Sequence, residues 1–237
     1  MLTTRVLVQN VYATTMMSEF DMLRILNKLK TCAFNYDGIK QSFFLIRPLS
    51  VLQTAMLKDC IVPDVIDEAP VDLATIKYSS GVEVSCGNRL TPKDVCDCPS
   101  ITWCSEVTNY YTVCMTDPDA PSRRNPKFRE WHHWLLVNIP GNLVNLGETL
   151  SEYIGSAPPY GTGLHRYVFL VYKQPMKMAF DEERLSNKSS RNRAQFRIKK
   201  FAEKYKFGNP VAGNYFKAKY DPYVLFINKQ LSDPCLQ

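Results

Sequence analysis

Three histidines and two aspartates are the side chains of this sequence best suited to acid–base, metal or anion chemistry. His132, His133 and His165 are its only histidines, and each borders a predicted strand beside a cluster of turn residues. Upstream, residues 117–121 (DPDAP) place two carboxylates at the end of another predicted strand. The two prolines fix two φ angles and disfavour helical backbone at the preceding residues. Strand ends that lead into loops are where binding and catalytic sites are usually built.

Strand alternation sorts these side chains. His132 and His133 must point to opposite faces of one strand, so only one of them can enter a given pocket. His165 and Tyr167 share a face, with Arg166 on the other. A single pocket could therefore collect Asp117, one of the paired histidines, His165 and Tyr167. Two aromatic residues close by in the sequence would supply an apolar wall, Phe128 and Trp131.

This set of side chains permits several chemistries. One carboxylate and two imidazoles can bind a metal ion, act as acid and base, or hold an oxyanion through protonated imidazoles and a tyrosine hydroxyl. The side chains could also merely satisfy one another at a sheet edge. The sequence has no G-x-S-x-G elbow, Walker loop or Rossmann glycine pattern to support an enzyme.

Composition limits the class of protein. The 237 residues are 45% hydrophobic and 22% charged, values that exclude disorder and collagen, and no run of about 18 apolar residues could span a bilayer. The formal net charge is +6, and this surplus lies between Lys177 and Lys206. In this segment apolar residues recur with the 3.6-residue period of a helix. The pattern predicts an amphipathic helix over residues 191–205 with a cationic stripe of Arg193, Arg197, Lys200 and Lys204. Such a stripe is either a solvated face or a surface for a membrane or nucleic acid.

The cysteines and the N-terminal segment bear on localisation. Eight cysteines without a clear secretory signal indicate a reducing compartment, and we predict a cytoplasmic protein. The pair Cys96 and Cys98, with Cys104 nearby, does not match the spacing of a structural zinc site. Residues 1–56, with one predicted helix over residues 18–29, form an extension that could be disordered or could target the chain to mitochondria or to secretion. We expect a chain that lacks residues 1–54 to fold.

Three short apolar segments rich in β-formers predict core strands, residues 110–116, 132–139 and 166–173. Because these segments are continuously apolar, we expect them to be covered on both faces. The turn-rich spacing favours a β-sandwich-like core.

Motifs in these strands and turns resemble a known family. Residues 117–123 (DPDAPSR), 129–133 (REWHH) and 161–167 (GTGLHRY) closely resemble the phosphatidylethanolamine-binding protein family, also known as the Raf kinase inhibitor protein family. The resemblance covers about residues 57–232, which we take as the domain 57–237. It implies a mainly β (α+β) fold with a large central antiparallel β-sheet, a smaller sheet packed on it and a C-terminal helix.

The resemblance also implies a small pocket for a phosphate or a phosphoethanolamine headgroup. Carried over residue by residue, the pocket uses Asp117, Trp131, His133, Pro159, His165, Tyr167 and Tyr223. Asp119 and Pro121 would shape its mouth, and Gly155 and Gly161 the facing loop. Two residues depart from the family pattern, Phe128 in place of a tyrosine and Ala157 in place of a glycine.

We therefore predict a non-enzymatic protein, without a cofactor, that binds phosphate-type anions and phosphatidylethanolamine headgroups. The resemblance implies that it inhibits a protein kinase or a serine protease. The alternative is a metal-dependent or acid–base hydrolase that uses Asp117, His133 and His165. We expect a monomer without a nucleic-acid partner, with peripheral membrane contact as a further prediction. If His133 and His165 are charged when they hold the anion, binding should strengthen as the pH falls from about 8 to 6.

Overall fold

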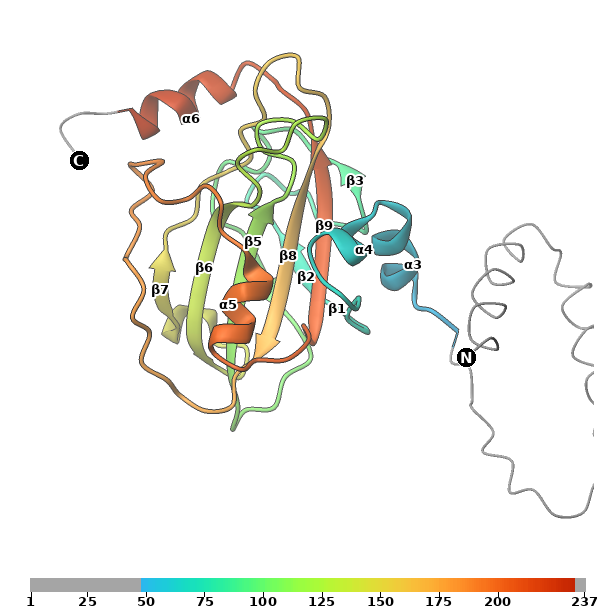
Figure 1. Ribbon diagram of the computed structural model, residues 1–237, viewed down its shortest axis with the longest axis vertical. Coiled ribbons are helices and arrows are strands. Elements are labelled where there is room, and N and C mark those ends of the chain that lie inside the picture. Colours follow the sequence, from blue (N-terminus) through green and yellow to red (C-terminus); the bar gives the residue numbers. More distant parts are fainter. Residues whose placement is uncertain (1–47, 233–237) are drawn as a thin grey trace, which may run out of the picture. The chain divides into compact units, whose positions relative to one another are not determined.

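Three long strands form the centre of the larger sheet in the computed structural model, which describes residues 48–232 (Figure 1). They are β5 (Tyr110–Asp117), β6 (Trp131–Pro140) and β8 (His165–Lys173). β5 lies between the other two and pairs antiparallel with both. The three predicted core strands are therefore confirmed.

Shorter strands complete two sheets. The large sheet has the order β1-β9-β8-β5-β6-β7, and β3 also pairs with β9. Because β1 and β3 run parallel to β9, this sheet is mixed, whereas a wholly antiparallel sheet was predicted. A second, two-stranded sheet is formed by β2 and β4. The remaining elements are β1 (Asp72–Leu73), β2 (Thr75–Lys77), β3 (Asn88–Arg89), β4 (Ser100–Thr102), the 3-10 helix η2 (Val144–Leu146), β7 (Glu148–Ser151), β9 (Ala212–Ala218), and the helices α3 (Val51–Lys58), α4 (Ile61–Asp64), α5 (Ile198–Lys204) and α6 (Val224–Leu231).

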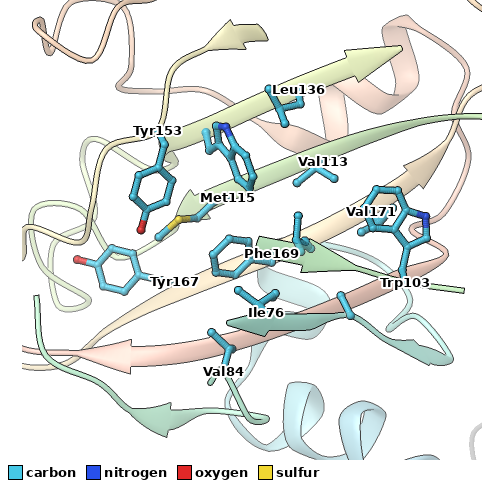
Figure 2. Packing of buried hydrophobic residues seen from close by; sticks show 14 of the residues in the cluster. Ile76, Val84, Trp103, Val113, Met115, Leu136, Tyr153, Tyr167, Phe169 and Val171 are labelled. Atoms are coloured by element: carbon cyan, nitrogen blue, oxygen red, sulfur yellow. The ribbon is translucent and has the colours of Figure 1, made fainter. Parts of the chain in front are cut away.

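Buried side chains form a core on each face of the large sheet. On one face, Ile76 of the small sheet packs in a cluster with Val113 and Phe169 (Figure 2). On the other face, Cys114 and Leu170 pack in a cluster with residues of α3 and α5. Successive residues of β5 and β8 thus enter opposite cores, as strand alternation requires. This double cover explains why the two strands read as continuously apolar. The predicted fold class, with a smaller sheet on a large one and a C-terminal helix, is confirmed.

The buried core includes residues on the N-terminal side of the predicted boundary at residue 56. Ser50 caps α3 through a reciprocal capping box with Gln53. Leu52 and Met56 of this helix are 2% and 0% exposed and belong to the core that covers the second face of the sheet. The expectation that residues up to 54 can be deleted is therefore revised. The predicted helix over residues 18–29 lies outside the described residues.

The predicted helix over residues 191–205 is shorter in the structure. α5 begins only at Ile198, because Asn192 and Gln195 adopt left-handed backbone with φ of 57° and 61°. Arg193, assigned above to the cationic stripe, is fully buried, so that assignment is wrong. Lys200 and Lys204 are exposed on α5 as expected.

Three further features concern only the described part of the chain. No helix within residues 48–232 is long and apolar enough to cross a membrane. In the same range, no group of three or more His, Cys, Asp or Glu side chains is arranged to hold a metal ion. The cysteines of this range are free thiols, among them Cys96, Cys98 and Cys104.

Candidate ligand-binding site

The ends of three strands bring the predicted site residues together. β5 runs antiparallel to β6 and β8, so its C-terminal end lies beside the N-terminal ends of both neighbours. Asp117, the last residue of β5, pairs with Trp131, the first residue of β6. His165 begins β8 on the other side. Side chains 48 residues apart in the sequence thus meet at one edge of the sheet, where Asp117 hydrogen-bonds His165.

A cavity of about 230 Å³ lies at this edge, and we call it the strand-end cavity. Seven of the eleven predicted site residues line it: Asp117, Pro121, Trp131, His133, Pro159, His165 and Tyr167. The other lining residues are Ala120, Phe128, Ala157, Ser190, Asn228 and Leu231. Most of the lining side chains are apolar. Polar groups converge from β5, β6 and β8, and Ser190 and Asn228 add polar groups from a loop and from α6. Ala157 does not have a positive φ, so its replacement of a glycine causes no backbone strain here.

Four predicted residues lie outside this cavity. Asp119 is fully buried against Arg166, on the opposite side of β8 from His165 and Tyr167. Gly155 packs closely on the backbone of a neighbouring segment, where an added Cβ would lie 2.9 Å from the carbonyl oxygen of Val95. Gly155 and Tyr223 line a different cavity of about 450 Å³. Gly161 is an exposed loop residue with φ of 77°.

Asp117 and His165 share a proton. The hydroxyl of Thr162 lies 2.7 Å from the carbonyl oxygen of Pro159 and donates its only proton there. The same hydroxyl is 2.9 Å from Nε2 of His165, so it must accept a proton from that nitrogen. Nδ1 of His165 is 2.8 Å from Oδ2 of Asp117, a contact that also needs one proton. Burial raises the pKa of Asp117, which favours a proton on this pair.

His133 is neutral in the free protein. Its Nδ1 is 2.9 Å from the carbonyl oxygen of Ile154, so Nδ1 carries the proton and Nε2 is left as an acceptor. Burial lowers the pKa of His133 to about 3, and the charge of Arg193 acts in the same direction. The expectation that His133 is charged when it holds an anion concerns the bound state and stays a prediction; without a ligand the ring is neutral.

His132 lies on the other face of β6, as alternation predicted. Its ring stacks on Phe196, with centroids 4.3 Å apart, and it does not line the strand-end cavity. Burial lowers its pKa to about 3 as well. Only His133 of the pair can contact a ligand in this cavity.

Tyr167 offers a hydroxyl that lies near Asp117 and the backbone of Ala157 but forms no hydrogen bond of normal geometry with either. Its side chain is fully buried, lines the cavity, and its hydroxyl has no hydrogen-bond partner. Burial and the nearby carboxylates of Asp117 and Asp119 raise its pKa well above the usual value, so it stays protonated. A buried, unpaired hydroxyl costs free energy, which a ligand that accepts its proton would recover.

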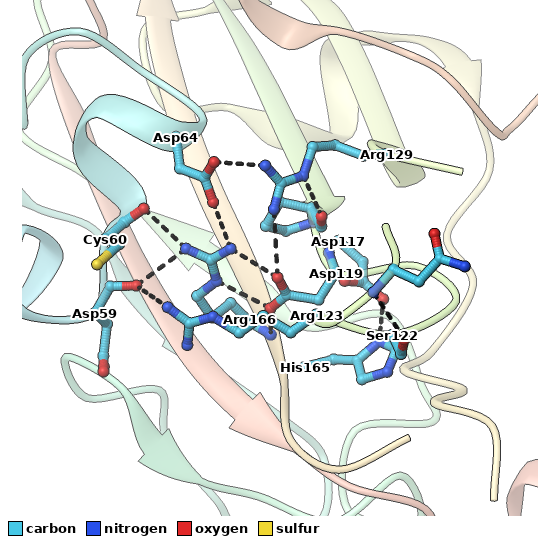
Figure 3. A network of polar contacts seen from close by, with 12 residues as sticks. Asp59, Cys60, Asp64, Asp117, Asp119, Ser122, Arg123, Arg129, His165 and Arg166 are labelled. Carbon is cyan, nitrogen blue, oxygen red and sulfur yellow. Dashed lines mark hydrogen bonds and ion pairs between the residues drawn. The ribbon is translucent and has the colours of Figure 1, made fainter. Parts of the chain in front are cut away.

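A network of ion pairs and hydrogen bonds around Arg166 supports the site on the opposite side of β8 from His165 (Figure 3). The Arg166 guanidinium donates to both carboxylate oxygens of Asp119, at 2.9 and 2.6 Å, and to Asp64 at 2.7 Å. It also donates to the carbonyl oxygens of Asp59 and Cys60, which follow α3. Asp119 in turn donates its backbone N–H to Oδ1 of Asp117 over 2.7 Å. The network therefore fixes Asp117 through the neighbouring turn, and ties the site to α3.

Sequence reasoning missed several residues of the site. Thr162 lies inside a quoted motif, and its position three residues before His165 in a turn was a usable signal. Ser190, Asn228 and Leu231 reach the cavity from loop and helix segments, and no local pattern marks them. Asp64 lies in a segment without periodicity, so its pairing with Arg166 could not be read from the sequence.

Comparisons with known proteins agree with this geometry. A family model described as "Phosphatidylethanolamine-binding protein" matches residues 72–216, more than half of the chain. The chain therefore belongs to the phosphatidylethanolamine-binding protein family.

Individual relatives are similar over most of their length. The chain is 40% identical over 171 residues to "Putative odorant-binding protein A5" of Drosophila melanogaster, which covers 72% of this chain and 81% of that protein. It is 43% identical to CG7054 in solution, with a TM-score of 0.61, over 74% of this chain and 99% of that one. It is 28% identical to a carboxypeptidase Y inhibitor complexed with the cognate proteinase, with a TM-score of 0.63, over 75% and 98% of the two chains. Together, the family and these relatives support a binding or regulatory role in general.

Proposed function

We propose that this chain binds a small phosphate-bearing ligand, such as the phosphoethanolamine headgroup of a lipid, in the strand-end cavity. The observation that carries the proposal is the unpaired, fully buried hydroxyl of Tyr167 beside the proton-sharing pair of Asp117 and His165. Membership of the phosphatidylethanolamine-binding protein family supports the same ligand class.

The polar groups complement a zwitterionic headgroup. The hydroxyl of Tyr167 can donate to a phosphate oxygen, because a charged acceptor forms the stronger hydrogen bond. The neutral His133 leaves Nε2 as an acceptor, and Asp117 offers carboxylate oxygens. Both can therefore accept hydrogen bonds from an ammonium group. The apolar side chains of Trp131 and Phe128 would contact the carbon atoms of the ligand.

Replacing Tyr167 with phenylalanine tests the proposal. We expect Tyr167→Phe to weaken phosphoethanolamine binding by about 1.5–3 kcal/mol, the range for a hydrogen bond to a charged group, or about 10- to 150-fold. Calorimetric titration measures this loss. Tyr172→Phe is the matched control, because Tyr172 lies on the same strand but packs in the core on the opposite face. Equal affinities of the wild type and Tyr167→Phe would contradict the proposal.

We also propose a regulatory role, the inhibition of a serine protease or of a protein kinase. For a protease target, support comes from the likeness to the carboxypeptidase Y inhibitor, which is complexed with its cognate proteinase.

A hydrolase that uses Asp117, His133 and His165 stays an alternative prediction. Release of free phosphate or ethanolamine from phosphoethanolamine by purified protein, lost in His133→Ala, would favour that alternative.

A further inference from the structure

The proposed ligand is anionic at its phosphate, yet no lysine or arginine of the described residues lines the strand-end cavity. One buried cation lies against a residue that lines the cavity. The guanidinium of Arg193 is 5.6 Å from the centre of the Trp131 ring, and Trp131 lines the cavity. The guanidinium also donates to the carbonyl oxygens of His132 and His133, at 3.1 and 3.3 Å.

No acid of residues 48–232 forms an ion pair with Arg193, although the nearby carboxylate of Glu152 favours its charged form. Its side chain is fully buried, and its terminal nitrogens donate only to backbone carbonyls, those of His132, His133, Glu152, Leu185 and Ser186. No carboxylate of residues 48–232 lies within ion-pair distance, and its Nε has no partner. Arg166, the other fully buried arginine, is paired with two aspartates instead.

An unpaired buried charge acts over a longer range than a surface charge. Solvent and salt screen it weakly, because water is excluded from its surroundings. Burial lowers the pKa of Arg193 to about 10, so the guanidinium stays charged at neutral pH. Its field therefore acts on whatever occupies the cavity that Trp131 lines.

We propose that Arg193 is the specificity-determining residue that makes the strand-end cavity select an anionic group. It acts through space from behind the wall formed by Trp131 and His133, without contact with the ligand. This inference rests on the proposed function, since it names the source of the charge selectivity of the same cavity.

The expected effect follows from the distance. A ligand atom in van der Waals contact with a face of the Trp131 ring lies within about 9 Å of the guanidinium, the ring distance of 5.6 Å plus about 3.5 Å. At that distance and an effective dielectric constant of about 20, a unit charge changes the affinity for a singly charged anion by roughly 20-fold.

Two substitutions at one position separate the charge from the structural role. Arg193→Lys and Arg193→Gln both lose most of the hydrogen bonds to the five carbonyls, but only lysine retains the positive charge. With inorganic phosphate as the probe in calorimetric titration, we expect Arg193→Gln to bind at least tenfold more weakly than Arg193→Lys. Equal affinities of the two variants would overturn the inference. A wild-type protein that binds no phosphate would instead overturn the proposed function.

A third variant keeps the inference testable if neither substitution at Arg193 folds. Lys127, Arg191 and Lys229 are exposed cations, each next in sequence to a residue that lines the cavity. Replacing all three with glutamine should leave the fold intact and change phosphate affinity by less than threefold. A tenfold loss would place the source of the attraction on the surface and would overturn the role of Arg193.

Discussion

Deleting the first turns of α3 should destabilise the domain relative to a chain that begins at Pro48. A chain that begins at Ala55 loses the capping box of Ser50 and the buried side chain of Leu52, which is 2% exposed. Loss of a buried leucine costs about 2–5 kcal/mol, and loss of a cap costs about 0.5–2 kcal/mol. The combined loss of about 2.5–7 kcal/mol is a large share of the about 5–15 kcal/mol that stabilises a typical domain.

Urea denaturation of matched chains measures this loss. With a slope of about 2 kcal/mol per molar urea, we expect the chain that begins at Ala55 to unfold at roughly 1–3.5 M less urea than one that begins at Pro48. In the longer chain, Leu52→Ala should reproduce most of this shift. Val51→Ala is the control, because Val51 is 79% exposed on the same helix. Equal midpoints for the two chains would refute the assignment of α3 to the core.

Two further predictions use buried ionisable groups. Glu130 is 2% exposed and burial raises its pKa to about 7, so ionisation destabilises the folded state as the pH rises from the unfolded pKa of about 4.5 through 7. The stability of Glu130→Gln relative to the wild type should therefore increase by about 2–3 kcal/mol between pH 5 and 8 in urea denaturation, and a constant difference would contradict this. Because the pKa values of His132 and His133 are lowered to about 3, their imidazole NMR signals should not titrate between pH 8 and 5. A midpoint near 6.5 for either ring would show that it is solvated or paired with an acid.

Local patterns predicted the strands and the inner side of the site. Continuous apolar runs marked β5, β6 and β8, because both faces of these strands are buried. Alternation then separated His132 from His133 and put His165 and Tyr167 on one face, which the structure confirms. These inferences succeeded because strand periodicity is a local property of the backbone.

The failures have a common physical cause in long-range pairing. The predicted helix over residues 191–205 depended on Ala194 and on Arg193 in a surface stripe, but Arg193 is taken up by carbonyls of residues 132, 133 and 152. A sequence pattern assigns a charged side chain to the solvent, because its burial depends on hydrogen-bond acceptors that are distant in the sequence. The same holds for α3, because its buried residues pack in a cluster with residues of β8 and β9 that are distant in the sequence.

The charged groups on the reverse face of β8 set the electrostatic surroundings of the cavity-lining Asp117, His165 and Tyr167. Between His165 and Tyr167, Arg166 points backward and pairs with Asp119, which leaves Asp117 as the carboxylate that faces the cavity. Asp119 also donates its N–H to Asp117 and so orients it toward His165. Alternation along a strand therefore couples the two faces. A substitution on the reverse face shifts the position or the protonation of the cavity-lining side chain next to it. For this reason, a change at Arg166, although it touches no ligand, should alter the cavity more than a change at the exposed Phe128, which lies on its rim.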